Sequence, residues 1–158
     1  MYRKVVVLLD GSELAEQVLP HVADIVRGRD SEVHLLSVAP VVAPPIAVAV
    51  DIYPVYATAE FLAAQEAERQ RIERDLKEYL ARVAERLRPV ASAVHTVVRF
   101  GQPAEEILAY AEEIGADLIA MCTHGRSGLS RWVYGSVADK VLRGAKCPVL
   151  LVRVRPPK

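Results

Sequence analysis

The sequence has few cysteines, no excess of charge of either sign and no long uninterrupted apolar run. It contains only two cysteines and starts directly with MYRKVVVLLDGS rather than with a basic and then apolar leader, so we expect a cytoplasmic protein. Lys plus Arg and Asp plus Glu each number 20. We therefore expect neither nucleic acid nor a membrane surface as a partner. The apolar stretch 33–50 contains one histidine and three prolines, which excludes a transmembrane helix there.

Two common phosphate-binding motifs are also missing. The sequence has no G-x-x-x-x-G-K-[ST] loop and no G-x-G-x-x-G after its first apolar run, which argues against a P-loop NTPase and a dinucleotide-dependent enzyme. The histidines stand at positions 21, 34, 95 and 124, without the spacing of metal ligands, so no metal site is predicted. His124 could contact a phosphate or act as an acid or base, with a turn-stabilising role as the alternative.

What the sequence does contain is a regular alternation of short apolar runs and helical segments. Strands are predicted over residues 5–9, 32–38, 95–100, 117–121 and 148–154. Helices are predicted over residues 14–26, 60–87, 103–115 and 137–143, with a kink at Pro20. This pattern predicts one α/β domain over residues 1–158, a doubly wound parallel sheet of five strands with helices on both faces. We expect the strand order 3-2-1-4-5, and a ligand site outside the carboxyl ends of the strands.

One connection, residues 40–59, is unusually long. It is apolar, rich in valine and proline, and almost free of charge. Structureless connections of this length are uncommon in compact domains. We interpret the segment as a functional flap that covers apolar surface or contacts a protein partner, with a simple variable insertion as the alternative.

The most specific signal is the segment MCTHGRSGLSRWVYGSV, residues 121–137. Gly125 and Gly128 permit close approach of backbone amides to a phosphate. Gly135 and Ser136 open a helix whose unpaired N–H groups and positive dipole end favour an anion, and the serine hydroxyl can add a donor. Because no Walker lysine is present, the charge of a phosphate chain must be met by amide dipoles and a divalent cation, for which we expect Mg²⁺, with Arg126 or Arg131 as further candidates on proximity alone.

With these residues in view, the chain resembles the universal stress protein family over nearly its whole length. The family's nucleotide signature is Gly, two residues, Gly, nine residues, Gly and then Ser or Thr. It falls here on Cys122, Gly125, Gly135 and Ser136, so three of the four positions match. The DGS after the first strand, the THGRSG turn and the CPVLLVR ending are also typical. The departure is Cys122, whose side chain could crowd the approach of a nucleotide.

The resemblance implies that the protein binds ATP, or AMP or ADP, together with Mg²⁺. It places Asp10 at the ribose or a metal-linked phosphate, although an Asp-Gly turn also needs this aspartate for local hydrogen bonds. It places Val38 and Met121 beside the adenine. The remaining predicted site residues belong to the glycine-containing segment: Cys122, His124, Gly125, Arg126, Gly128, Gly135, Ser136 and Val137.

We interpret the protein as a nucleotide-binding stress or signalling module without catalytic residues, with at most slow ATP turnover. One alternative is an ATP-hydrolysing or adenylyl-transferring enzyme, for which the expected histidine motif and lysine cluster are missing. Another is a family member that has lost nucleotide binding and acts through dimerisation and protein partners. The apolar last strand is expected at an edge of the sheet, so residues 149–154 predict a homodimer formed by strand pairing between two subunits.

Overall fold

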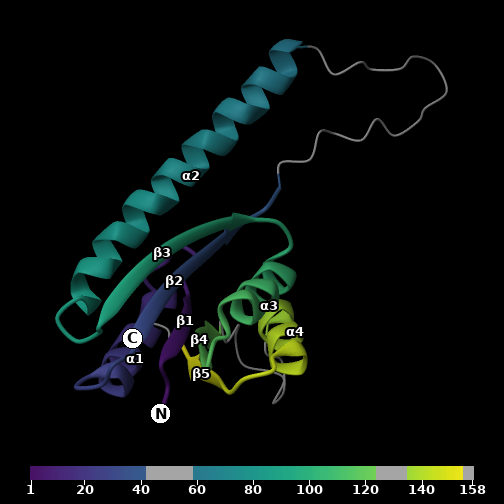
Figure 1. The fold of residues 1–158 in the computed structure, drawn as a ribbon. Helices are drawn as coiled ribbons and strands as arrows, with labels where there is room; N and C mark the ends of the chain where they lie inside the picture. The colour runs from purple at the N-terminus through teal and green to yellow at the C-terminus, as the bar shows by residue number, and fades with distance from the viewer. Residues whose placement is uncertain (42–58, 124–134, 155–158) are drawn as a thin grey trace.

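The computed structural model describes residues 1–41, 59–123 and 135–154, in which strands and helices alternate (Figure 1). The strands are β1 (Lys4–Leu8), β2 (Glu32–Ala39), β3 (Ala93–Phe100), β4 (Leu118–Thr123) and β5 (Val149–Arg153). The helices are the short 3₁₀ helix η1 (Ala15–Val18), α1 (Leu19–Val26), α2 (Ala59–Leu87), α3 (Pro103–Ile114) and α4 (Ser136–Gly144). Most of the predicted flap falls on residues 42–58, outside the described residues, so its role stays a prediction.

The five strands form one parallel sheet in the order β3-β2-β1-β4-β5, which confirms the predicted topology. From β1 the chain adds β2 and β3 on one side, and then crosses over to add β4 and β5 on the other. The winding direction therefore reverses between β1 and β4, where open sheets of this kind leave room for a ligand at the strand ends.

Helices cover both faces of the sheet, which explains why the strands read as continuous apolar runs. On one face Val5 and Val7 pack in a cluster with side chains of α1 and α2. On the other face Val6 packs in a second cluster with side chains of α3 and α4. All three valines are fully buried. Each such side chain contributes about 1.5–3 kcal/mol to the stability of the fold.

The segment after β1 differs from the prediction at Pro20. The expected kinked helix is instead the 3₁₀ helix η1 followed by α1, and Pro20 lies in the first turn of α1. A proline is accommodated there because the first N–H groups of a helix have no partner within the helix. The prediction of a kink was therefore wrong, and Pro20 marks a helix start.

The longest helix, α2, contributes buried side chains to the core only from its last turns. Its buried side chains are Leu80, Val83, Ala84 and Leu87. The earlier turns extend beyond the sheet (Figure 1), and the apolar side chain of Leu62 in these turns is 51% exposed. None of the helices in the described ranges combines the length and the apolar character that crossing a bilayer requires.

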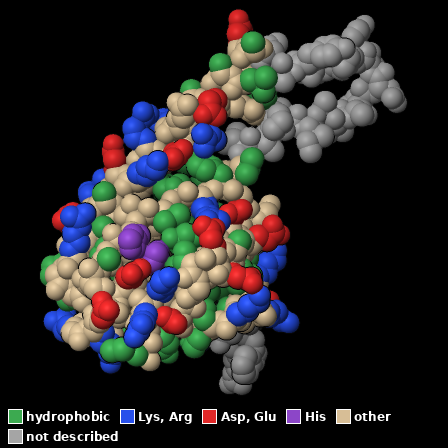
Figure 2. All heavy atoms as spheres, viewed as in Figure 1, with side chains coloured by type: hydrophobic (Ala, Val, Ile, Leu, Met, Phe, Trp, Pro, Cys, Tyr) green, Lys and Arg blue, Asp and Glu red, His purple; other side chains and the backbone are tan. Residues whose placement is uncertain are grey.

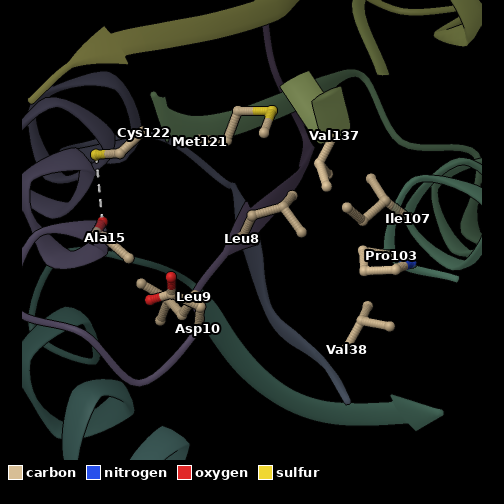
Figure 3. Close-up of a pocket in the computed structure, with 10 residues that line it drawn as sticks. All are labelled: Leu8, Leu9, Asp10, Ala15, Val38, Pro103, Ile107, Met121, Cys122 and Val137. Carbon is tan, nitrogen blue, oxygen red and sulfur yellow. Dashed lines mark hydrogen bonds between the residues drawn. The ribbon is translucent and has the colours of Figure 1, made fainter. Parts of the chain in front are cut away.

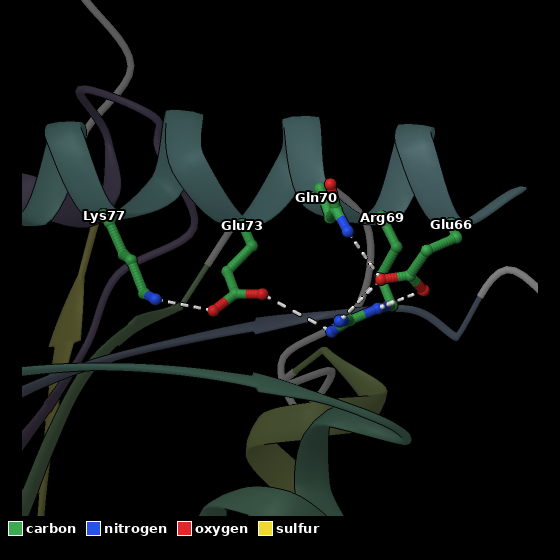
Figure 4. Close-up of polar contacts among 5 residues, drawn as sticks. All are labelled: Glu66, Arg69, Gln70, Glu73 and Lys77. Atoms are coloured by element: carbon green, nitrogen blue, oxygen red, sulfur yellow. Dashed lines mark hydrogen bonds and ion pairs between the residues drawn. The ribbon is translucent and has the colours of Figure 1, made fainter. Parts of the chain in front are cut away.

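Ion pairs run along the projecting turns of α2 (Figure 4). Arg69 pairs with Glu66 at 3.1 Å and with Glu73 at 3.4 Å. Lys77 pairs with Glu73 at 2.6 Å. Such pairs, three or four residues apart on a helix surface, add little to helix stability because water screens them. Arg69 also lies over the Phe100 ring of β3, with its Cζ 5.3 Å from the ring centroid, so this face of α2 contacts the end of the sheet as well as water.

A carboxylate clamp fixes the start of β1 to the start of β4. The backbone N–H groups of Arg3 and Lys4 donate to Asp117 Oδ2 at 2.8 and 2.9 Å. These two hydrogen bonds hold the pKa of the Asp117 carboxyl below its usual value. In return, the Asp117 N–H donates to the Lys4 carbonyl at 2.9 Å. The clamp lies at the amino ends of the strands, so it serves stability rather than the ligand site.

Candidate functional site

A cavity of about 260 Å³ opens at the carboxyl ends of β1, β2 and β4 (Figure 3). Its lining is apolar apart from one carboxylate and one thiol. The lining residues are Leu8, Leu9, Asp10, Ala15, Val38, Pro103, Ile107, Met121, Cys122 and Val137. The structure thus brings together five of the residues that the sequence placed in a nucleotide site: Asp10, Val38, Met121, Cys122 and Val137.

The cavity lies where the two helical layers separate. Ala15 and Cys122 lie on one side of it, and Pro103, Ile107 and Val137 lie on the other (Figure 3). On the first side, Ala15 belongs to η1, and the thiol of Cys122 in β4 faces it. The residues of the second side belong to α3 and α4. The cavity is therefore a consequence of the reversal of winding between β1 and β4.

The Asp10 carboxylate is fixed at the cavity by a tight turn. The Ser12 N–H and the Ser12 hydroxyl both donate to Asp10 Oδ1, at 2.9 and 2.6 Å. Gly11 between them has a φ of +86°, which favours glycine. The local hydrogen bonds that an Asp-Gly turn requires are thus present. They orient an exposed carboxylate beside the cavity, so the local role and a ligand role are compatible.

Hydrogen bonds between β1 and β2 hold the cavity floor in place. The Leu9 N–H donates to the Leu36 carbonyl at 3.0 Å. The buried Ser37 hydroxyl donates to the Leu9 carbonyl at 2.6 Å. Both backbone groups of Leu9 are therefore satisfied just before the turn at Asp10. A floor fixed in this way is typical of sites that are formed before the ligand arrives.

The thiol of Cys122 points toward η1. Its Sγ donates to the Ala15 carbonyl at 3.4 Å, on the side of the cavity away from Val137 (Figure 3). Burial raises the pKa of the Cys122 thiol, so it stays protonated at neutral pH and is a poor nucleophile. Among the described residues, Cys122 and Cys147 are both free thiols.

The amino end of α4 adjoins the cavity through Val137. Gly135 is the residue that caps this helix, and its carbonyl accepts a hydrogen bond from the Asp139 N–H at 3.0 Å. Gly135 and Ser136 are exposed and lie beside the cavity rather than in its lining. The positive end of the α4 dipole is therefore next to the apolar cavity, an arrangement that suits a ligand with an apolar part and an anionic part.

Four predicted site residues, His124, Gly125, Arg126 and Gly128, lie outside the described residues. The sequence reasoning in turn missed half of the lining: Leu8, Leu9, Ala15, Pro103 and Ile107. The sequence pattern could have indicated two of these lining residues. Pro103 and Ile107 follow the carboxyl end of β3 at helical spacing, so the rule that led to Val38 at the end of β2 also applied to them.

The chain matches known proteins over nearly all its length. The sequence profile described as the Universal stress protein family matches residues 1–153. A universal stress protein of Methanocaldococcus jannaschii, MJ0531, is 34% identical over 154 residues, which cover 97% of this chain and 83% of that protein.

Solved structures show the same fold. The structure of MJ0577, also from Methanocaldococcus jannaschii, superimposes with a TM-score of 0.76 at 26% identity and covers 99% of both chains. A universal stress protein in complex with cAMP has a TM-score of 0.65 at 19% identity, over 98% of both chains. An Arabidopsis thaliana family protein with AMP bound has a TM-score of 0.62 at 15% identity, over 97% of this chain and 92% of that one. At these identities the last two similarities show the fold alone.

Proposed function

The chain belongs to the universal stress protein family, and we propose that it binds an adenine nucleotide in the cavity at the carboxyl ends of β1, β2 and β4. The observation that carries this proposal is an apolar cavity at the point where winding reverses, with a carboxylate and the amino end of a helix beside it. The cAMP and AMP complexes of two proteins with the same fold support it.

The size of the cavity fits the nucleoside part of such a ligand. Small-molecule sites usually measure about 300–1,000 Å³, and this cavity of about 260 Å³ is slightly smaller than that range, so it suits part of a nucleotide rather than the whole. In our proposal the adenine packs among Val38, Ile107 and Met121, all of which carry apolar side chains into the cavity (Figure 3). The phosphates then extend past Val137 toward Gly135, where the dipole of α4 favours negative charge.

The donor set also fits Mg²⁺ as a companion of a longer phosphate chain. Mg²⁺ prefers oxygen ligands and is usually held by one or two carboxylates together with substrate phosphates. Asp10 supplies the one carboxylate in the cavity lining. Its Oδ1 is committed to Ser12, so Oδ2 is the atom that we assign to the metal or to a ribose hydroxyl. We therefore propose ATP with Mg²⁺ as the complete ligand. AMP is the smallest nucleotide that still tests both the adenine site and the phosphate site.

The proposed role is a nucleotide-dependent stress or signalling module in the cytoplasm, where free thiols stay reduced. The Cys122 thiol is protonated and faces η1 rather than the amino end of α4. The described cavity lining contains no nucleophilic side chain with a general base beside it. The proposal therefore includes no rapid hydrolysis or transfer of the nucleotide's phosphates.

We further propose that the protein dimerises through β5, which lies at the edge of the sheet among the described strands. The Pro148 carbonyl and the Val154 N–H both bond inward, to Ile119 and Thr123 of β4. Because backbone groups alternate in direction along a strand, Leu151 directs its N–H and carbonyl outward. A second copy of β5 can pair with these outward groups about a two-fold axis.

Calorimetric titration with AMP, and with ATP in the presence of Mg²⁺, tests the nucleotide site. Gly135→Val is the informative variant, because Gly135 has a φ of −52° that any residue adopts. Among the described residues, no atom lies within 4 Å of an added Cβ there, so the variant should fold normally. We expect micromolar binding to the wild type and a loss of at least tenfold in the variant. Absence of binding to the wild type would favour a protein that acts through dimerisation alone.

A further inference from the structure

Three metal-ligating side chains meet on the sheet face that α3 and α4 cover, away from the nucleotide cavity. Glu32 and His34 lie two residues apart on β2, and His95 of β3 is the register partner of His34. Side chains at these positions project from the same face of a parallel sheet. Figure 2 shows histidine side chains gathered at one place on the surface, next to an acidic side chain.

His34 has an unsatisfied nitrogen that points into this group. The residue is only 7% exposed, and its Nδ1 lies 2.8 Å from the Tyr110 hydroxyl. Its Nε2 is buried and has no hydrogen-bond partner. The nearest opposite charge, Glu32 Oε2, is 3.6 Å away, which is too long for a hydrogen bond. Buried polar atoms in native proteins are nearly always paired, so this orphaned nitrogen requires an explanation.

The positions of the three donor atoms explain the unpaired His34 nitrogen, because the atoms are close enough together to share a metal ion. Glu32 Oε2 lies 3.6 Å from His34 Nε2 and 3.8 Å from His95 Nε2. One donor atom from each residue can be chosen so that all three lie within 4.8 Å of one another. Ligands at about 2.0–2.1 Å from a tetrahedral Zn²⁺ are roughly 3.3 Å apart. The His34 and His95 rings are stacked, with centroids 4.5 Å apart and an interplanar angle of 25°. In our proposal the half-exposed His95 ring turns out of this stack until both Nε2 atoms face one ion.

The charge state of the group also suits a cation. Burial, followed by the nearby His95, lowers the pKa of His34, so its imidazole is neutral near pH 7 and has a free lone pair. Glu32 contributes a negative charge. The nearby positive charge of Lys4 is directed elsewhere, because its Nζ donates to the Ile114 carbonyl at 3.1 Å.

We propose that Glu32, His34 and His95 bind one divalent transition-metal ion, which their donor atoms identify as Zn²⁺, with water as the fourth ligand. Two imidazoles and one carboxylate suit Zn²⁺ better than Mg²⁺ or Ca²⁺, which prefer oxygen ligands alone. His34 Nε2 ligates the metal, and His34 Nδ1–H donates to the Tyr110 hydroxyl. Such an outer hydrogen bond is what orients histidine ligands in zinc proteins. The bound ion links β2, β3 and, through Tyr110, α3.

Zinc titration of the untagged protein against a chromophoric chelator tests this site. We expect one Zn²⁺ per chain in the wild type, and a loss of affinity of roughly 100-fold or more in His95→Ala. His95 is half-exposed, so this variant should remain folded. His21→Ala removes an exposed histidine of α1 and is the matched control, with unchanged zinc affinity expected.

Two further measurements separate a built site from loose binding to surface histidines. Tyr110→Phe keeps the ring and removes the hydroxyl, so it should weaken zinc binding about tenfold through the loss of the hydrogen bond to His34. Co²⁺ in place of Zn²⁺ should give the intense visible absorption of a tetrahedral site in the wild type and not in His95→Ala. Substoichiometric zinc binding by the wild type, or an equal affinity in His95→Ala, would overturn the proposal.

Discussion

Replacing Cys122 with glycine, the residue that the family signature has at this position, should destabilise the fold without strengthening nucleotide binding. The thiol faces the Ala15 carbonyl at 3.4 Å and packs against the cluster under α1 and α2. It does not face Val137 at the amino end of α4 (Figure 3). Its removal therefore opens no space where the phosphates are proposed to lie.

The expected magnitude follows from this position. Cys122 is half-buried in β4, and loss of its side chain removes about 0.5–1 kcal/mol of apolar burial. Glycine inside a strand costs about a further 0.5–1 kcal/mol relative to alanine. The sum of ~1–2 kcal/mol corresponds to a fall in Tm of about 2–8 °C for a chain of this size.

Thermal unfolding and AMP calorimetry on three proteins measure both effects. We compare the wild type with Cys122→Gly and Cys122→Ala. The alanine variant loses the thiol without gaining the backbone flexibility of glycine, so it separates the two contributions to the change in stability. We expect the three AMP dissociation constants to agree within about threefold. A gain of tenfold or more in Cys122→Gly, about 1.4 kcal/mol, would show that the cysteine obstructs the ligand and would refute this reasoning.

Further predictions concern the cavity, the sheet edge and the clamp. Val38→Trp fills the cavity and should weaken AMP binding at least tenfold, whereas Leu142→Trp, on the exposed side of α4, should leave affinity unchanged in the same titration. Leu151→Pro removes an outward N–H and should raise the dimer dissociation constant in sedimentation experiments, with Leu151→Ala as the control that keeps this N–H. Asp117→Asn should lower the free energy of unfolding by about 1 kcal/mol at pH 7 in urea titrations. Because folding lowers the pKa of Asp117, this contribution is complete above the unfolded-state pKa and is lost as pH falls through the folded-state pKa, so the two proteins should converge in stability at pH values below the folded-state pKa.

The sheet could be predicted from the sequence because its strands are buried on both faces. A run such as VVVLL is too short for a helix, is rich in β-branched valine and is followed by turn residues, and these three features together favour a buried strand. The ends of the elements were less certain: β4 continues to Thr123, two residues beyond the prediction. The helix after β1 was wrong at Pro20, because the sequence pattern does not tell a proline that kinks a helix from one that starts it.

The candidate site was predictable where it depends on strand ends and unpredictable where it depends on packing between layers. Asp10, Val38 and Met121 follow from their places in the strands, and the structure brings them to one cavity. The cluster of Glu32, His34 and His95 shows the opposite case. Its histidines are 61 positions apart in sequence, and only the register of β2 with β3 makes them neighbours. The absence of a local ligand spacing therefore did not exclude a metal site.

The most direct test of the nucleotide site is a methyl NMR spectrum of the protein titrated with AMP. If the adenine lies where we propose, the methyl signals of Val38, Ile107, Met121 and Val137 shift strongly and saturate together, and those of Leu142 stay unchanged. A spectrum without saturable shifts, or with shifts confined to methyl groups outside the cavity, would contradict the assignment of this cavity to an adenine nucleotide.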